Sequence, residues 1–273
     1  MRKRVSGIKR QYHIDCVKGD LAEFLIVPGD PDRVPKIAEH WDSCKEVSSH
    51  REFRSFTGKY KDVPVSALSS GIGPACMSIV VNEASNVGVK TFIRAGSTGA
   101  IQKNIRCGEV VISSAAVRLD GTSNCYIVPE YPASADYEVL MALVEAAEIL
   151  GIARYHVGIT ATTADFYAGQ SRTAPASCLS TSNDMTGILE KARVLSLEME
   201  TATLFTLASL YGLRAGSVCA VFGNRVTGEL KPGAGEEDAI RIANEAVKIL
   251  YEWDSVKKRR RKRWFFPSLI RGA

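Results

Sequence analysis

The stretch IVPGDPDR at residues 26–33 marks a junction between a buried strand and a helix. Its first residues continue an apolar run that begins at residue 23, and Asp30 and Pro31 are typical of the first positions of a helix. Gly29 lets the backbone approach a ligand closely, the free amides at a helix start suit an anion, and Arg33 could add a positive charge. The alternative is a tight turn followed by a solvent-exposed arginine.

Short apolar runs and amphipathic stretches alternate along most of the chain. The short runs predict strands at residues 23–27, 64–68, 91–95, 110–117, 155–161, 194–199 and 215–222. The amphipathic stretches predict helices at residues 31–40, 75–86, 135–150, 200–211 and 236–253. This alternation predicts an α/β fold with a mixed or mostly parallel sheet and helices on its faces. In such a fold, ligands bind at the carboxyl ends of strands.

Composition and charge are those of an ordinary globular protein. The chain has 273 residues, of which 45% are hydrophobic and 24% charged, and this excludes a disordered or collagen-like chain. We take one domain as the default. The formal net charge of +5 is smaller than the charge of the basic run at residues 257–263, so the rest of the chain is net negative. General affinity of the fold for nucleic acid is therefore not expected.

Cysteine and histidine usage argues against disulfides and metals. The 7 cysteines form no C-x-x-C pair, which fits reduced thiols, and the 4 histidines show no metal-ligand spacing. The basic start lacks the apolar run of a signal peptide, and no stretch has the apolar length of a membrane span. We therefore expect a cytoplasmic protein without a metal.

A second glycine-rich segment, RAGSTGA at residues 94–100, follows an apolar strand. Backbone amides with the hydroxyls of Ser97 and Thr98 could cradle phosphate oxygens, and Arg94 could form bidentate hydrogen bonds. The segment matches neither a Walker loop nor a dinucleotide fingerprint. It therefore favours free phosphate or another small anion.

The segment LEMETA at residues 197–202 carries two acids where a strand gives way to a helix. In extended geometry Glu198 and Glu200 project to one face and Met199 to the other, although a turn would alter this. A carboxylate there could hold the two hydroxyls of a ribose. The alternative is a glutamate that caps the helix and is stabilised by the helix dipole.

The fourth segment, DFYAGQSR at residues 165–172, offers donors and acceptors suited to a planar ring. Gln170 and Arg172 match a ring that displays carbonyl groups beside an N–H, and Phe166 and Tyr167 provide a stacking surface. A polar surface turn is the alternative. The following residues 173–187 are small and polar, which predicts a long loop over the site.

Taken in order, these segments resemble the nucleoside phosphorylase family, and within it the uridine phosphorylases. The resemblance covers residues 8–253 and is carried by GDPDR, SHREF at 49–53, RAGSTGAI at 94–101, VRLDG at 117–121, FYAGQSR and EMETA. It implies a single α/β domain with a central mixed β-sheet flanked by helices, and a basic tail at residues 254–273 outside the domain. It also implies a homo-hexamer, a trimer of dimers with active sites shared across the dimer interface.

The resemblance also implies a role for each candidate site residue. Inorganic phosphate, the co-substrate, would be bound by Gly29, Arg33, Arg94, Ser97, Thr98 and Arg51 of the partner subunit. Ribose would be held by Met199, Glu200 and His13 of the partner subunit. The base would be bound by Gly99, Phe166, Gln170, Arg172, Glu198 and Arg225. Catalysis would depend on Arg94, Glu200, Arg172 and Gln170. No cofactor and no metal are implied.

These roles describe the reversible phosphorolysis of uridine to uracil and ribose 1-phosphate in pyrimidine nucleoside salvage, with deoxyuridine and thymidine as further candidate substrates. The reaction needs positioned phosphate and stabilisation of the leaving base, but no enzyme nucleophile. Purine-specific relatives usually place an aspartate near the end of the last core strand. Here that stretch reads FGNR at residues 222–225, which has no acid and favours uracil.

Two other functions remain open from the sequence. The same scaffold serves purine nucleoside and methylthioadenosine phosphorylases, and a nucleoside- or RNA-binding module could keep the fold without turnover. The tail, which contains KKRRRKRWFFPSLI from residue 257, could bind RNA or an anionic membrane surface. The alternative is a solvated or subunit-docked extension. No other nucleic-acid or membrane partner is expected.

Overall fold

A computed structural model describes residues 10–172 and 184–270 of the chain. Within these residues, ten strands form one mixed sheet in the order β10-β6-β8-β9-β5-β1-β4-β3-β2, with β7 paired to β6. The strands are β1 (Phe24–Val27), β2 (Ser43–His50), β3 (Phe53–Tyr60), β4 (Val63–Leu68), β5 (Thr91–Ala100), β6 (Val110–Leu119), β7 (Ala133–Ser134), β8 (Tyr155–Thr163), β9 (Ser196–Glu198) and β10 (Arg214–Asn224). The helices are α1 (Arg33–Ala38), α2 (Pro74–Val87), α3 (Tyr137–Ile149), α4 (Met185–Lys191), α5 (Thr201–Leu210) and α6 (Glu236–Arg260), with single 3-10 turns at η1 (Thr122–Cys125), η2 (Ala168–Gln170) and η3 (Pro267–Ile270). The predicted α/β fold with a mixed sheet is confirmed.

The middle of the sheet is parallel and part of it closes on itself. β1 pairs in parallel with β4 and β5, and β5 pairs in parallel with β10. Because β10 also pairs with β6, and β6, β8, β9 and β5 follow one another in the sheet, these five strands form a closed circuit. The antiparallel strands β2 and β3 extend the sheet beyond β4.

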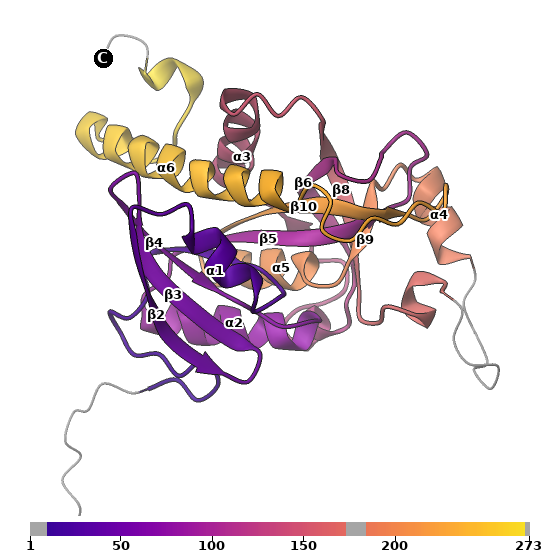
Figure 1. Ribbon diagram of the computed structural model, residues 1–273, viewed down its shortest axis with the longest axis horizontal. Helices are drawn as coiled ribbons and strands as arrows, with labels where there is room; N and C mark the ends of the chain where they lie inside the picture. Colours follow the sequence, from indigo (N-terminus) through magenta and orange to yellow (C-terminus); the bar gives the residue numbers. More distant parts are fainter. Residues whose placement is uncertain (1–9, 173–183, 271–273) are drawn as a thin grey trace, which may run out of the picture.

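Helices cover both faces of this sheet (Figure 1). Alternate residues of β1 show the division: Phe24 and Ile26 pack with α1, α3 and α6, whereas Leu25 and Val27 pack with α2 and α5. A strand buried on both faces reads as a continuous apolar run, which is why β1 is readable in the sequence. None of the described helices is long and apolar enough to cross a membrane.

Several elements differ from the sequence predictions, which also missed the strands β3 and β7. β2 was not predicted because its SCKEVSSH sequence is polar and largely exposed. β5 runs on to Ala100, five residues beyond the end of the predicted strand, so the segment at residues 94–100 is part of a strand. Residues 173–183 of the predicted long loop lie outside the described residues, but its last residues enter a helix, where the Asp184 side chain accepts a hydrogen bond from Gly187 N at 2.9 Å and caps α4.

The C-terminal segment packs on the domain, so the predicted domain boundary after residue 253 falls inside α6. Arg261, at φ 52°, ends the helix in the left-handed conformation and turns the chain back. Phe265 then stacks on Trp253 with ring centroids 3.9 Å apart, and its backbone N donates to Glu138 at 2.8 Å. The sequence pattern missed this contact because a single buried ring gives no periodic signal.

Phe265→Ala should lower the free energy of unfolding by about 3 kcal/mol, because it deletes a buried aromatic ring and leaves a cavity against Trp253. Guanidinium denaturation at fixed protein concentration measures the loss. Phe266→Ala is the matched control: its side chain is exposed, and we expect a loss of about 1 kcal/mol or less. Equal effects of the two substitutions would contradict the docking of Phe265.

Candidate active site

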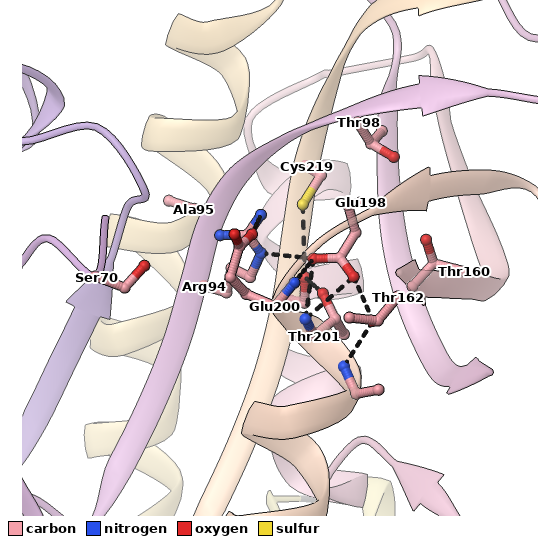
Figure 2. A network of polar contacts seen from close by, with 12 residues as sticks. Ser70, Arg94, Ala95, Thr98, Thr160, Thr162, Glu198, Glu200, Thr201 and Cys219 are labelled. Carbon is pink, nitrogen blue, oxygen red and sulfur yellow. Dashed lines mark hydrogen bonds and ion pairs between the residues drawn. The ribbon is translucent and has the colours of Figure 1, made fainter. Parts of the chain in front are cut away.

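Arg94, on the central strand β5, lies at the middle of a buried cluster of charges (Figure 2). Its side chain is 4% exposed; Nε donates to Glu198 at 3.0 Å, and Nη2 lies 2.5 Å from a Glu200 oxygen. Gly96 makes room for this guanidinium, since a Cβ there would lie 2.7 Å from the Arg94 Cζ. Gly96 of the RAGSTGA segment therefore leaves space for the Arg94 side chain.

This cluster has two carboxylates, Glu198 and Glu200, for the single guanidinium of Arg94. Burial opposes the charge of Arg94, but Glu200 and Glu198 attract it and raise its pKa. Burial raises the pKa of Glu200, against the opposing effect of Arg94. The Nη1 atom of Arg94 is also buried and has no hydrogen-bond partner within the described residues. A buried N–H without an acceptor is costly, so this atom is a candidate donor to a ligand.

Glu198 anchors Arg94 and the start of α5. Its carboxylate accepts hydrogen bonds from the backbone amides of Glu200 and Thr201, both at 2.9 Å, and from the Thr162 hydroxyl. Figure 2 shows it between Arg94 and Thr162. The resemblance places Glu198 at the base, which stays a prediction; in the structure its carboxylate contacts Arg94 and the start of α5. Thr162 was not predicted from the sequence, because a threonine within a strand carries no mark of a distant partner.

The rest of the RAGSTGA segment offers fewer donors than its sequence suggests. Its backbone pairs with β10 along residues 94–100, and Gly99 and Ala100 also pair with β9. The Thr98 hydroxyl donates to Leu197 O at 2.8 Å. On the other side of β5, β1 pairs only with residues up to Arg94 and β9 only from Gly99 on, so residues 95–98 have no described strand beside them there. The binding of phosphate by backbone amides of this segment stays a prediction.

The loops after β1 and β4 bring Gly29 and Glu200 to the same edge of the sheet. A Cβ at Gly29 would lie 3.3 Å from Gly71 O, so the two loops touch. Gly73, in the second loop, donates its backbone N to Glu200 at 2.5 Å. Glu200 is therefore held from both sides, by a backbone amide and by Arg94, at the carboxyl ends of the parallel strands.

Arg33 reaches this edge from α1. It donates through Nη1 to Ala95 O at 3.2 Å and through Nε to Glu236 at 2.9 Å, and Glu236 also contacts Lys36. Burial raises the pKa of Glu236, but Lys36 and Arg33 outweigh it and lower that pKa. Glu236 was missed from the sequence, where it reads only as an acid in the first turn of a helix.

The proposed base-binding residues form a second group around the end of β8. Gln170 is buried and donates to the Thr163 hydroxyl at 3.2 Å, and the Arg172 guanidinium lies 4.1 Å from the centre of the Phe166 ring. Arg225 donates its backbone N to Ala100 O at 2.8 Å and its Nη2 to Ser171 O at 3.3 Å. These contacts join residues 165–172 to β5 and to the end of β10.

This second group also holds unused donors. Arg172 Nε and Arg225 Nη1 are buried without a hydrogen-bond partner within the described residues. Burial lowers the pKa of both guanidiniums, and Arg225 lowers that of Arg172 further. Two unpaired N–H groups on neighbouring cations suit carbonyl oxygens or a developing negative charge.

Asn224 has no spare hydrogen-bonding group for a base. Its Nδ2 donates to Gln102 O at 2.9 Å and Ile105 O at 2.6 Å, and its Oδ1 accepts from Val226 N and Thr227 N. This side chain is 2% exposed and shapes the turn after β10. The position therefore holds the backbone rather than a ligand.

His13 and Arg51 lie together, in a third group. His13 contacts Glu83 through Nδ1 at 2.6 Å, and Arg51 lies over the ring of the adjacent Tyr12 at 5.7 Å. Arg51 occupies the turn between β2 and β3 with a φ of 56°. Neither side chain forms a hydrogen bond or an ion pair with Arg94 or Glu200 of the same chain. Met199 is half-buried next to Glu200.

The described residues contain no group of three or more His, Cys, Asp or Glu side chains that could hold a metal. The half-buried Cys76 donates to Glu52 at 3.4 Å, and burial, reinforced by Glu52, raises the pKa of this thiol to about 11. The cysteines in the described part of the chain are free, and Cys178 lies outside it. The absence of a cofactor stays a prediction.

Comparison with known proteins places these residues in a family. A family model described as the phosphorylase superfamily matches residues 23–252. A uridine phosphorylase of Thermococcus kodakarensis is 54% identical over 95% of this chain and 93% of its own length, and the Escherichia coli uridine phosphorylase is 43% identical over 88% and 95%. A guanosine phosphorylase of Halorubrum lacusprofundi is 38% identical over 88% and 99%. The chain belongs to the phosphorylase superfamily.

Proposed function

We propose that this protein is a uridine phosphorylase, which converts uridine and inorganic phosphate to uracil and ribose 1-phosphate. The observation that carries the proposal is the placement of buried guanidinium N–H groups that have no hydrogen-bond partner in residues 10–172 and 184–270: Arg94 Nη1 in one group, and Arg172 Nε with Arg225 Nη1 in the other. Each would gain an acceptor from a ligand, and such donors are strongest where water is excluded. Relatives that carry the name uridine phosphorylase support the same substrate.

Phosphate would bind at the edge formed by Gly29, Arg33 and Arg94. The two arginines have their donors fixed by Ala95, Glu236 and the Glu198 carboxylate, so they need little reorganisation when the anion arrives. Bound there, the anion would be oriented towards the anomeric carbon of the ribose. Its negative charge would also stabilise the positive charge that develops on the oxocarbenium-like ribose.

Uracil would bind against Phe166, with its edge facing Gln170, Arg172 and Arg225. As the glycosidic bond breaks, the bonding electrons move to the base, and negative charge develops on its ring and carbonyl oxygens. Arg172 and Arg225 would stabilise this charge by hydrogen bonding, without transfer of a proton, because each has a buried N–H that no described residue accepts. Glu200 would accept hydrogen bonds from the ribose hydroxyls between the two groups.

The third group, with His13 and Arg51, supports a site shared between subunits. These side chains form no hydrogen bond or ion pair with Arg94 or Glu200 of their own chain, and Tyr12 beside them is 71% exposed. We propose that His13 and Arg51 complete the ribose and phosphate sites of a neighbouring copy, in a dimer that is part of a hexamer. We also propose that phosphate is the co-substrate, that no other cofactor or metal takes part, and that the enzyme serves pyrimidine salvage in the cytoplasm.

A purine substrate is the second candidate, favoured by the similarity to a guanosine phosphorylase. Protonation of a purine ring nitrogen calls for an acid near the end of β10, and Asn224 there has both its amide groups occupied by backbone partners. A binding module without turnover is less consistent with fixed arginines at both ends of the site. These contacts favour uridine.

The first test is the ultraviolet absorbance of purified protein with uridine, with and without inorganic phosphate, beside inosine, guanosine and methylthioadenosine. We expect loss of uridine only when phosphate is present. Cleavage of purine nucleosides alone would contradict the base assignment and leave the phosphate site intact. No cleavage of any nucleoside would favour a binding module.

Arg172→Ala should lower kcat/KM for uridine about 100-fold, the effect of losing about two charge-assisted hydrogen bonds to the departing base. The KM for phosphate should stay within about twofold, because Arg172 belongs to the second group of residues. Steady-state kinetics with each substrate varied in turn measures both. Arg106→Ala, at an exposed arginine outside the site, is the control. A parallel loss of phosphate binding would contradict the assignment.

Asn224→Asp should not create purine turnover and should lower the free energy of unfolding by about 3 kcal/mol, because a buried carboxylate would face Gln102 O and Ile105 O without donating to them. Inosine turnover and guanidinium denaturation measure the two effects. Asn124→Asp, at an exposed asparagine, should have little effect. A stable, inosine-cleaving Asn224→Asp protein would show that this position reads the base.

A further inference from the structure

The basic run that ends α6 forms a fixed surface, which we call the basic tip and define as Lys258, Arg259, Arg260, Arg261, Lys262 and Arg263. Figure 1 shows this end of α6 projecting at one corner of the molecule, whereas β9 and α4 lie towards the opposite side. The segment also lies beyond residue 252, where the match to the family model ends. The reaction proposed above gives it no role.

The tip is held in place by buried contacts on both of its sides. Before it, Lys257 contacts Asp254 at 2.9 Å and also Glu138. After it, Phe265 is 2% exposed and stacks on Trp253. Between them Arg261 adopts a left-handed conformation, which costs a non-glycine residue energy and persists because the flanking contacts fix the chain. A solvated, unattached tail would not need this reversal.

The tip exposes positive charge together with aromatic rings. Residues 259–263 are all exposed, and within the described residues Lys258, Arg259, Arg261, Lys262 and Arg263 have no acidic partner within 4.0 Å. Trp264 is 53% exposed and Phe266 40%, on either side of the buried Phe265. Since the rest of the chain is net negative, this charge is concentrated at one place.

A cavity of about 690 Å³ lies beside the tip, but its lining does not point to an anion site. Arg214 and Lys257, which line it, are paired with Glu138 and Asp254. Lys90, a third lining cation, is paired with Glu23, and the remaining one, Arg263, belongs to the tip itself. The exposed face of the tip, where Lys258, Arg259, Arg261, Lys262 and Arg263 have no acidic partner among the described residues, is the stronger candidate for a binding surface.

The geometry of the tip favours a lipid surface over nucleic acid. Its cations crowd into a few successive residues at a chain reversal, whereas the phosphates of a nucleic acid strand are fixed along its length and are usually matched by an extended groove. Anionic lipids are mobile and can gather around a compact cluster. Trp264 and Phe266 are the residue types that enter the interface between headgroups and acyl chains.

We propose that the basic tip, with Trp264 and Phe266, binds the surface of membranes that contain anionic lipids. The cations contact lipid headgroups and the two rings insert at the interface, while the site on β5 stays on the body of the domain. Because none of these residues belongs to the proposed active site, the proposal does not depend on the identity of the nucleoside.

The test is cosedimentation of the full chain with phosphatidylcholine vesicles, with and without phosphatidylglycerol, over a range of salt concentrations. We expect binding only to the anionic vesicles and a decrease as salt increases. Arg259→Glu with Arg261→Glu should lower the partition coefficient at least about thirty-fold, given the contribution of each basic residue near an anionic surface. Trp264→Ser with Phe266→Ser should weaken the binding that remains at high salt.

Lys18→Glu with Lys103→Glu is the matched control, since it makes the same change in net charge at exposed lysines elsewhere. We expect its binding within about twofold of the parent chain. Equal loss in this control would show a general charge effect and overturn the proposal. So would tight, salt-dependent binding of single-stranded RNA, measured by fluorescence anisotropy, without binding to vesicles. Unfolding midpoints near those of the parent chain exclude loss of the fold as the cause.

Discussion

The burial of the Arg94 guanidinium is the constraint on which the candidate site depends. A buried charge must be paired and hydrogen-bonded, and Arg94 is paired with Glu198 and Glu200. These two carboxylates are buried as well and need donors of their own. Glu198 accepts hydrogen bonds from amides at the start of α5 and from the Thr162 hydroxyl, and Glu200 accepts one from the amide of Gly73. Strand β5, the start of α5 and the loop after β4 are thereby fixed to one another.

The elements predicted well from the sequence are those whose burial is local and periodic. β1 alternates between two cores and gives a continuous apolar run, and the turn through Gly29 into α1 has the expected helix-start residues. The strand that carries the RAGSTGA segment was predicted only to residue 95, because the small and polar residues after it give no strand pattern. Its glycine at residue 96 instead makes room for Arg94, a reason that only the packing reveals.

Roles that depend on distant partners could not be predicted from local pattern. Glu198 and Glu200 are two residues apart, but β9 ends at Glu198, and the turn that follows gives them different partners. Glu236 contacts Arg33 although the two residues are 203 positions apart in the sequence. Asn224 is fixed by carbonyls more than 100 residues away. In each case the sequence shows the residue type, but the distant partner that determines its role is known only from the structure.

The two groups of the site are linked by a single strand, which sets their separation. Arg33 donates to Ala95 O and Arg225 donates to Ala100 O, and both acceptors belong to β5. Five residues of extended strand span about 16 Å. This length is compatible with the proposed binding of a nucleoside with a phosphate at one end, in which Glu200, paired with Arg94, would hold the sugar. Because β5 is paired with β1, β9 and β10, the distance between the two groups is as rigid as the sheet itself.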